Sequence, residues 1–181
     1  MKKLKLSELN RINVKEFKDS LKTPVTIVLD NIRSLHNIGS VFRTADAFRI
    51  EAIYLCGITG TPPNKEIHKT ALGSTESVNW KYFEKTIEAL NILKENKYTL
   101  FAVEQAESSN MLDEFELPPN NKIAIIFGNE INGIDELLMD EVDGCIEIPQ
   151  YGTKHSLNIS VSVGIVVWEI FQKIKVNKKT R

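Results

Sequence analysis

Short apolar segments alternate with helical patterns along most of the chain, and this alternation restricts the fold more than any other feature. The apolar segments are rich in Val, Ile and Tyr, which is typical of strands covered on both faces. The predicted strands are residues 25–29, 52–56, 98–103, 123–127 and 145–148. The predicted helices are residues 39–48, 65–71, 86–95, 134–139 and 157–174. The pattern predicts an α/β fold with a mostly parallel sheet and helices on both faces.

The chain length and the position of its charges indicate how the chain is organised. With 181 residues and no internal repeat, it fits a single domain, which we place at residues 23–175. Residues 1–22 form a helical or loosely packed lead-in with a net charge of +4, and residues 176–181 form a basic tail. The last twelve residues carry +5, so residues 23–169 between the two ends carry −10. Basic ends on an acidic body fit a polyanionic partner, or they serve solubility alone.

Several common classes of protein find no support in the sequence. Cys56 and Cys145 lie far apart, and the three histidines are isolated, so we expect neither a disulfide framework nor a metal site. The turn after the first strand has only Gly39, so the dinucleotide-binding fingerprint is absent, as is a P-loop. No signal peptide and no membrane-spanning segment is recognisable. We therefore expect a cytoplasmic protein without membrane contacts.

Three loops rich in Gly, Asn and Ser follow predicted strands, at residues 30–39, 128–133 and 149–158. The carboxyl ends of parallel strands meet at one edge of a sheet, where ligands of open α/β folds bind. Gly, Asn and Ser suit tight turns and close approach of the backbone to a ligand. The three loops together predict a binding site at this edge.

Arg43 and the last helix each allow two interpretations from their local sequence. Arg43 lies on the predicted helix 39–48, six residues beyond Asn37 in the preceding loop. Its guanidinium either binds a phosphate or forms an ion pair with Asp46 or Glu51. The last helix is apolar nearly all round and is therefore buried. Its small residues allow close packing inside the domain or against a second subunit.

Three motifs make the chain resemble the TrmH/SpoU branch of the SPOUT RNA methyltransferases. The first is NIGSVFRTADAF at residues 37–48. The second is IIFGNEING at residues 125–133, and the third is IPQYGTKHSLNISV at residues 148–161. The motifs occur in the family's order and spacing, and the resemblance covers residues 25–171. Arg49 and Gln150 stand where the family usually has glycine and methionine, and neither position carries a role in the reaction.

The resemblance implies a fold, a cofactor and an assembly. The fold is an α/β sheet whose C-terminal part is tied in a trefoil knot. S-adenosyl-L-methionine binds bent in the knot, held largely by backbone groups, and the family works as a homodimer with the last helix at the interface. The cofactor-binding positions are Gly128, Ile148 and Leu157, with Glu104 on a neighbouring wall.

The resemblance also implies an activity, the methylation of a ribose 2′-hydroxyl in tRNA or rRNA. Arg43 takes the place of the catalytic arginine, and the supporting polar positions are Asn37, Glu130, Ser156 and Asn158. Arg43 either abstracts the hydroxyl proton or anchors phosphate and stabilises the developing charge. Two alternatives stay open: methylation of a base instead of a ribose, and a non-catalytic RNA-binding or cofactor-sensing protein on the same fold.

Overall fold

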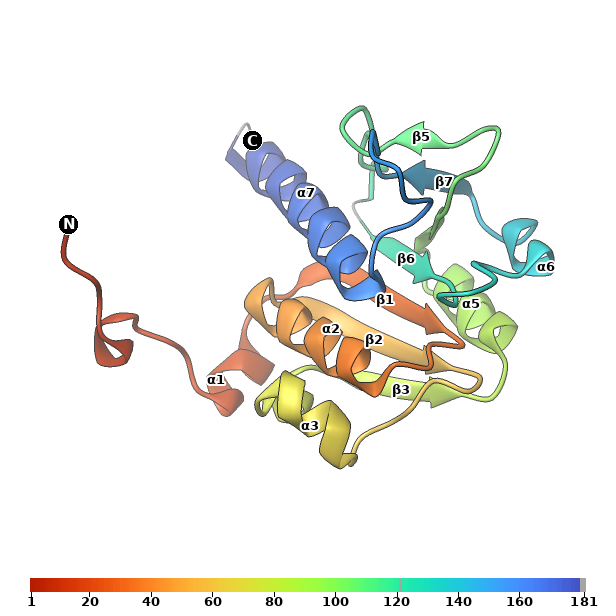
Figure 1. The fold of residues 1–181 in the computed structure, drawn as a ribbon. Helices are drawn as coiled ribbons and strands as arrows, with labels where there is room; N and C mark the ends of the chain where they lie inside the picture. The colour runs from red at the N-terminus through yellow and green to blue at the C-terminus, as the bar shows by residue number, and fades with distance from the viewer. Residues whose placement is uncertain (121, 180–181) are drawn as a thin grey trace.

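The computed structural model describes residues 1–120 and 122–179, and one parallel sheet forms its centre (Figure 1). The sheet has the order β3-β2-β1-β6-β4-β7-β5, and all six neighbouring pairs are parallel. The strands are β1 (Thr23–Asp30), β2 (Ile50–Cys56), β3 (Trp80–Phe83), β4 (Thr99–Val103), β5 (Asn110–Met111), β6 (Ile123–Phe127) and β7 (Gly144–Glu147). The expected parallel sheet is confirmed.

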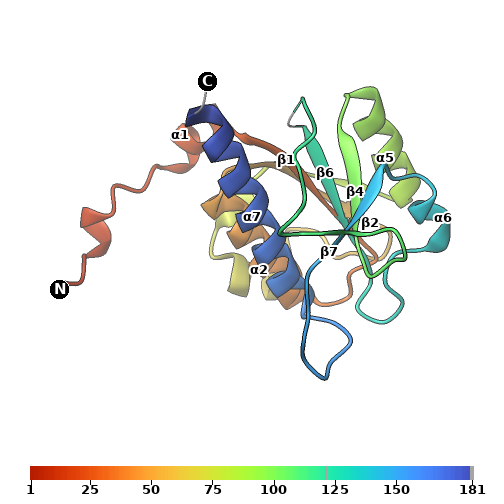
Figure 2. The ribbon, with the colours of Figure 1, turned by 90° about the horizontal axis from the view of Figure 1, so that it is seen from above.

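Helices cover both faces of the sheet, as predicted. They are α1 (Val14–Asp19), α2 (Leu35–Ala47), α3 (Lys65–Ala71), α4 (Ser74–Ser77), α5 (Thr86–Glu95), α6 (Glu136–Met139) and α7 (Ile159–Lys179), preceded by a 3-10 turn at Leu6–Glu8. Side chains of α1, α2, α3 and α7 share one core with Ile27, Leu29 and Ile125. Helix α5 packs on the opposite face, against Val28 and Ile126 (Figure 2). Each central strand therefore buries both faces, which explains its continuous apolar sequence.

The predicted elements differ from the observed ones mainly at their ends. Helix α2 begins at Leu35, four residues before the prediction, because the Ser34 hydroxyl accepts a hydrogen bond from the Asn37 amide at 3.3 Å. Asn37 therefore lies in the first turn of a helix, and its prediction as a loop residue was wrong. Helix α7 continues to Lys179, beyond the predicted end at residue 174, so the predicted tail 176–181 is largely helical; Thr180 and Arg181 lie outside the described residues.

Two strands have no counterpart among the predictions. Strand β3 is at the edge of the sheet and its residues are half-buried or exposed, so it lacks the apolar run of a central strand. Strand β5 is two exposed residues at the other edge, Asn110 and Met111. Edge strands that cover one face or none carry little signal in their sequence.

Arg49 has a backbone conformation that glycine adopts more easily than other residues. Its backbone has φ of +50°, in the left-handed region that favours glycine. The residue closes the turn between α2 and β2, where its carbonyl accepts a hydrogen bond from the Thr23 amide at 2.8 Å. The Arg49 side chain itself is exposed on the surface of this turn.

Candidate active site

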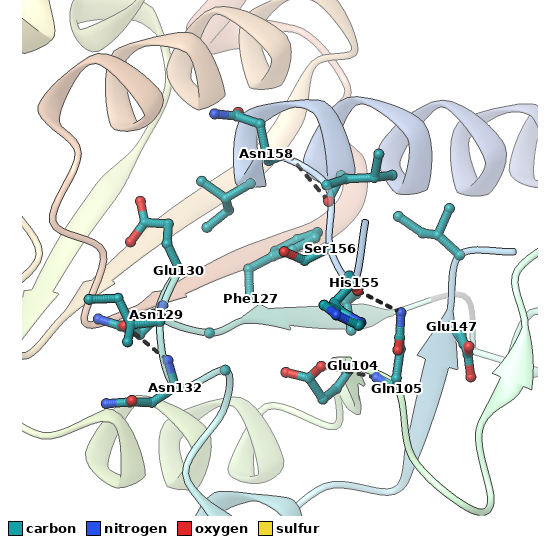
Figure 3. Close-up of a pocket in the computed structure, with 18 of the residues that line it drawn as sticks. Glu104, Gln105, Phe127, Asn129, Glu130, Asn132, Glu147, His155, Ser156 and Asn158 are labelled. Carbon is teal, nitrogen blue, oxygen red and sulfur yellow. Dashed lines mark hydrogen bonds between the residues drawn. The ribbon is translucent and has the colours of Figure 1, made fainter. Parts of the chain in front are cut away.

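The loops that follow β4, β6 and β7 surround a cavity of about 720 Å³ at the carboxyl edge of the sheet (Figure 3). The three loops come from strands that are neighbours in the sheet, β6, β4 and β7. The start of α7 closes another side through Asn158, Ile159 and Ser162. Of the three loops expected to form a binding site, 128–133 and 149–158 line this cavity, whereas the loop 30–39 does not and the loop after β4 takes its place.

The loop after β6 is a tight turn whose shape depends on two glycines. Asn129 and Gly133 exchange backbone hydrogen bonds of 3.0 and 2.9 Å, and Gly133 has φ of +68°. A Cβ atom on Gly128 would lie 2.3 Å from the carbonyl carbon of Gly133, so the two strands of the turn approach each other too closely for a side chain. The turn therefore presents its backbone to the cavity.

Asn129 fixes this turn to the rest of the sheet edge. Its side-chain oxygen accepts hydrogen bonds from the amides of Ile131 at 2.8 Å and Asn132 at 3.3 Å. Its side-chain nitrogen donates to the carbonyl of Asn31 at 2.8 Å, in the loop after β1. One side chain thus links two loops that are 98 residues apart in the sequence.

Three polar side chains from different segments form a hydrogen-bonded chain beside the cavity. Asn37 on α2 donates to the Glu130 carboxylate at 3.3 Å, and Asn158 donates to the side-chain oxygen of Asn37 at 3.2 Å. Asn158 also accepts from the Ser160 amide at 2.9 Å, which stabilises the first turn of α7. The structure therefore brings together one predicted residue from each of the three motifs.

The loop between β7 and α7 supplies the remaining predicted positions on the cavity wall. Ile148, Ser156 and Leu157 line the cavity together with Gly128 and Glu104. The carbonyl of His155 accepts a hydrogen bond from the side chain of Gln105 at 3.0 Å, which joins this loop to the loop after β4 (Figure 3). In Figure 2 the same loop extends beyond the sheet.

Glu104 is held by two hydrogen bonds, one to its side chain and one to its backbone. The Gln105 amide donates to its carboxylate at 3.0 Å, and the Cys145 thiol donates to its carbonyl at 3.3 Å. Burial raises the pKa of the Cys145 thiol, which keeps the thiol protonated and able to donate. Cys56 is also buried, with its pKa raised to about 12, and both cysteines are free.

Two predicted site residues do not line this cavity: Asn37, which reaches its wall through hydrogen bonds with Glu130 and Asn158, and Arg43. Arg43 is exposed on α2 and lines a second, open hollow of about 490 Å³ with residues of α3. Within the described residues it makes no ion pair. The hydroxyl of Ser77 donates to Asp46, so the alternative in which Arg43 pairs with Asp46 or Glu51 finds no support.

The sequence alone did not reveal two residues of the site, Asn129 and Gln105. Each acts by joining loops, through contacts with residues 98 and 50 positions away in the chain. Asn129 lies inside the second motif, next to Glu130, so its place in that motif was the available signal. Gln105 follows Glu104, which the resemblance placed on a wall of the cofactor site, so that neighbour was the available signal.

The described residues also give two general results. No group of three or more His, Cys, Asp and Glu side chains among them is placed to hold a metal ion. None of the helices in this part of the chain combines the length and the hydropathy needed to cross a membrane.

Comparison with known families identifies the class of protein that this fold and site define. The model of the SpoU rRNA Methylase family matches residues 24–168, which include all three loops and both hollows. The chain therefore belongs to the SpoU rRNA methylase family.

Individual relatives agree with this assignment. A putative TrmH family tRNA/rRNA methyltransferase of Staphylococcus aureus is 29% identical over 160 residues, 88% of this chain and 63% of that protein. An AdoMet-bound rRNA methyltransferase from Sinorhizobium meliloti has a similar structure, with a TM-score of 0.78, 25% identity and coverage of 86% of this chain and 59% of that one. An RNA 2′-O ribose methyltransferase superposes with a TM-score of 0.74 at 24% identity, over 85% and 58% of the two chains. The chain thus spans less than two thirds of these relatives.

Proposed function

We propose that this protein transfers a methyl group from S-adenosyl-L-methionine to a ribose 2′-hydroxyl of tRNA or rRNA. The observation that carries the proposal is the hydrogen-bonded chain of Asn37, Glu130 and Asn158, one from each family motif, beside the cavity. Its family membership and the two activities named for its relatives, rRNA methylation and RNA 2′-O-ribose methylation, support the same conclusion.

The residues around the cavity fit S-adenosyl-L-methionine. The cofactor carries a sulfonium and an ammonium group, and the described lining contains the carboxylates Glu104, Glu130 and Glu147 but no lysine or arginine. Ile148, Leu157 and Phe127 supply apolar surface for the adenosine, and the glycine turn 128–133 offers backbone hydrogen-bonding groups. These residues would hold the cofactor.

The cofactor, when bound, supplies an electrophilic methyl group, and the protein must orient and activate the ribose hydroxyl. Asn37, Ser156 and Asn158 carry polar groups suited to position a hydroxyl at the mouth of the cavity. Arg43 has two candidate roles, removal of the hydroxyl proton and stabilisation of developing negative charge. A guanidinium offers hydrogen-bond donors and no acceptor, which favours charge stabilisation.

A methyl-transfer assay tests this function. The chain is incubated with radiolabelled S-adenosyl-L-methionine and unmodified tRNA or rRNA, and the RNA is then digested to nucleosides. We expect the label in 2′-O-methyl nucleosides. Label in a methylated base would select the base-methylating alternative, and cofactor binding without transfer to any RNA would select the non-catalytic one.

We further propose a C-terminal trefoil knot, as the family resemblance implies. Helix α7 packs against α2, and its Lys173 ammonium also contacts carbonyls of Leu112, Asp113 and Phe115, a segment that precedes it in the chain. Figures 1 and 2 show α7, which follows β7 in the chain, lying beside α2 on one face of the sheet. This return of the chain between earlier segments supports the proposed threading.

A homodimer is the assembly that we propose. Val161, Ile165 and Trp168 follow the i, i+4, i+7 spacing of one face of α7, and they are 48%, 37% and 49% exposed. Exposed apolar stripes of this kind are typical of protein interfaces. The small residues Ser160, Ser162 and Gly164 would allow a second helix to approach closely.

A further inference from the structure

The hollow between α2 and α3 combines positive charge with a position close to the candidate active site. It is lined by Ser40, Arg43, Thr44, Ala47, Phe48, Lys69 and Thr70. Two of these residues are cationic, and none of the described lining residues is acidic. Such a surface attracts an anion, and the planar guanidinium of arginine suits phosphate oxygens in particular.

The local packing keeps the two cations on neighbouring helices close together. A Cβ atom on Gly39 would lie 2.1 Å from the Thr70 hydroxyl and 2.3 Å from the Ile67 carbonyl, so α3 approaches α2 closely only because Gly39 has no side chain. The hydroxyls of Ser40 and Thr70 both donate to the His36 carbonyl, each at 2.9 Å. The Thr70 hydrogen bond and the close approach at Gly39 join α3 to α2 and fix the place of Lys69 relative to Arg43.

Both cations are available to a ligand. Arg43 makes no ion pair within residues 1–120 and 122–179. Lys69 pairs with the Glu66 carboxylate at 2.8 and 2.9 Å, but the two side chains are 54% and 40% exposed. Exposed ion pairs contribute little to stability, so a phosphate can replace Glu66 as the partner of Lys69 at small cost.

The hollow also continues the polar side of α2 that begins at the cavity. Asn37, Ser40 and Thr44 follow the i, i+3, i+7 spacing of one helix face. Arg43 is six residues beyond Asn37, about 9 Å along the axis at the rise of an α-helix. An RNA strand whose reacting ribose lies beside Asn37 therefore has a neighbouring phosphate within reach of the hollow.

We propose that Lys69 and Arg43 bind a backbone phosphate of the RNA substrate in this hollow. The inference rests on the proposed function and deepens it by adding Lys69 as a substrate-binding residue that no motif contains. Lys69 holds the RNA and takes no part in the transfer, whereas Arg43 retains its candidate catalytic role. The Glu66 carboxylate opposes binding, because it pairs with the Lys69 ammonium in the absence of phosphate.

Two charge-neutralising variants with opposite expected effects test this site. Lys69→Gln should weaken binding of bulk tRNA or rRNA severalfold at 50 mM salt. It should also reduce the magnitude of the slope of log K against log salt by about 0.7–0.9, the value for one phosphate contact. Its KM for RNA should rise while kcat stays within about twofold, because uniform binding is lost. Glu66→Gln should strengthen RNA binding, because it releases Lys69.

Matched controls come from the opposite face of the sheet. Lys94 on α5 forms a similarly exposed pair with Glu141, at 2.6 Å and with 40% and 41% exposure. Lys94→Gln and Glu141→Gln should leave RNA affinity and its salt dependence unchanged, and all four variants should bind S-adenosyl-L-methionine as the wild type does. RNA affinity and salt slope unaltered by Lys69→Gln, in a chain that methylates RNA, would overturn the phosphate site and leave the proposed function intact. A wild-type chain that neither binds nor methylates RNA would overturn both.

Discussion

Arg43 is the residue whose substitution most sharply tests the proposed reaction. Its side chain is exposed and makes no ion pair with the described residues, so Arg43→Ala should fold with unchanged stability. It lies outside the cavity proposed for the cofactor, so calorimetry should show unchanged affinity for S-adenosyl-L-methionine. Methyl transfer should fall by about 10²–10³, the usual effect of losing one group that stabilises transition-state charge.

The substitution Arg43→Lys separates the two roles proposed for this residue. Lysine keeps the charge and loses the planar pair of donors. Partial recovery of methyl transfer relative to Arg43→Ala would favour charge stabilisation. No recovery would favour a role as the general base or a bidentate contact with the substrate. Near wild-type turnover of Arg43→Ala on a verified RNA substrate would show that Arg43 is not catalytic.

Gly128 permits a second test at the scale of single residues. A methyl group at this position would lie 2.3–2.4 Å from backbone atoms of Gly133 and Ile134, which cannot move as a flexible side chain does. Gly128→Ala should therefore distort the turn, lower the free energy of unfolding by about 1–3 kcal/mol and weaken cofactor binding at least tenfold. Gly152→Ala is the control, because no atom lies within 4 Å of its new methyl group. Urea unfolding and calorimetry on both variants measure the difference, and equal behaviour would contradict the assigned role.

The motifs predicted the content of the site better than its geometry. Asn37, Glu130 and Asn158 come from three distant segments, and their order along the chain did not indicate that they touch. Helix periodicity placed Arg43 on a helix but not in its hollow, because the hollow depends on how α2 packs against α3. That packing follows from the absence of a side chain at Gly39, a contact that one isolated glycine in a sequence does not reveal.

At the scale of elements, α7 depends on Lys173 for one of its attachments. The Lys173 ammonium donates to the carbonyls of Leu112 at 3.2 Å, Asp113 at 3.1 Å and Phe115 at 2.6 Å, and its side chain is 24% exposed. Lys173→Met keeps much of the aliphatic chain but leaves these carbonyls without their donor. Its free energy of unfolding should fall by about 1.5–3 kcal/mol, the range for hydrogen bonds to a charged group.

The control for this attachment is two residues further along the same helix. Lys175 is exposed, and its ammonium lies 5.9 Å from the centre of the Phe171 ring. Lys175→Met should change the free energy of unfolding by about 0.5 kcal/mol or less, as most exposed substitutions do. Equal midpoints of urea unfolding for the two variants would show that Lys173 does not anchor the helix.

The sequence predicted elements well where they are buried and poorly where they are at an edge. The strands at the centre of the sheet were found because burial of both faces requires continuous apolar residues. The edge strands β3 and β5 were missed because only part of their surface is covered. The strand order was not predictable, since parallel pairing is decided by crossovers and packing that leave no pattern in the strands themselves.

At the scale of the whole molecule, the C-terminal basic segment continues helix α7 as far as Lys179, whereas the N-terminal basic segment lies mostly before the domain. Helix α1 is attached to it through the buried side chain of Phe17, whereas the residues before α1 extend away from the sheet (Figure 1). Leu4, Leu9 and Ile12 in that extension are all exposed. That these ends bind RNA stays a prediction, separate from the hollow on α2 and α3.

The last prediction concerns the assembly, because helix α7 contacts both the hollow that contains Arg43 and the cavity at the sheet edge. Trp168 packs edge-on against Phe48 at 5.7 Å between ring centres, and Phe48 lines the hollow that contains Arg43. The first turn of the same helix lines the cofactor cavity. We expect light scattering at micromolar concentration to give the mass of a homodimer, because association removes Val161, Ile165 and Trp168 from water.

A charge placed on this face should separate the subunits without unfolding them. Ile165 is 37% exposed in the single chain. The carboxylate of Ile165→Glu would therefore remain hydrated in a monomer but would be buried and unpaired in a dimer. Such a charge costs about 3–5 kcal/mol, which weakens the dimer by at least a factor of 100. Leu137→Glu is the control, because Leu137 is 77% exposed on α6, away from α7, and this variant should remain dimeric. A wild-type chain that is monomeric at micromolar concentration and still methylates RNA would contradict the proposed assembly, and the apolar stripe on α7 would then need another partner.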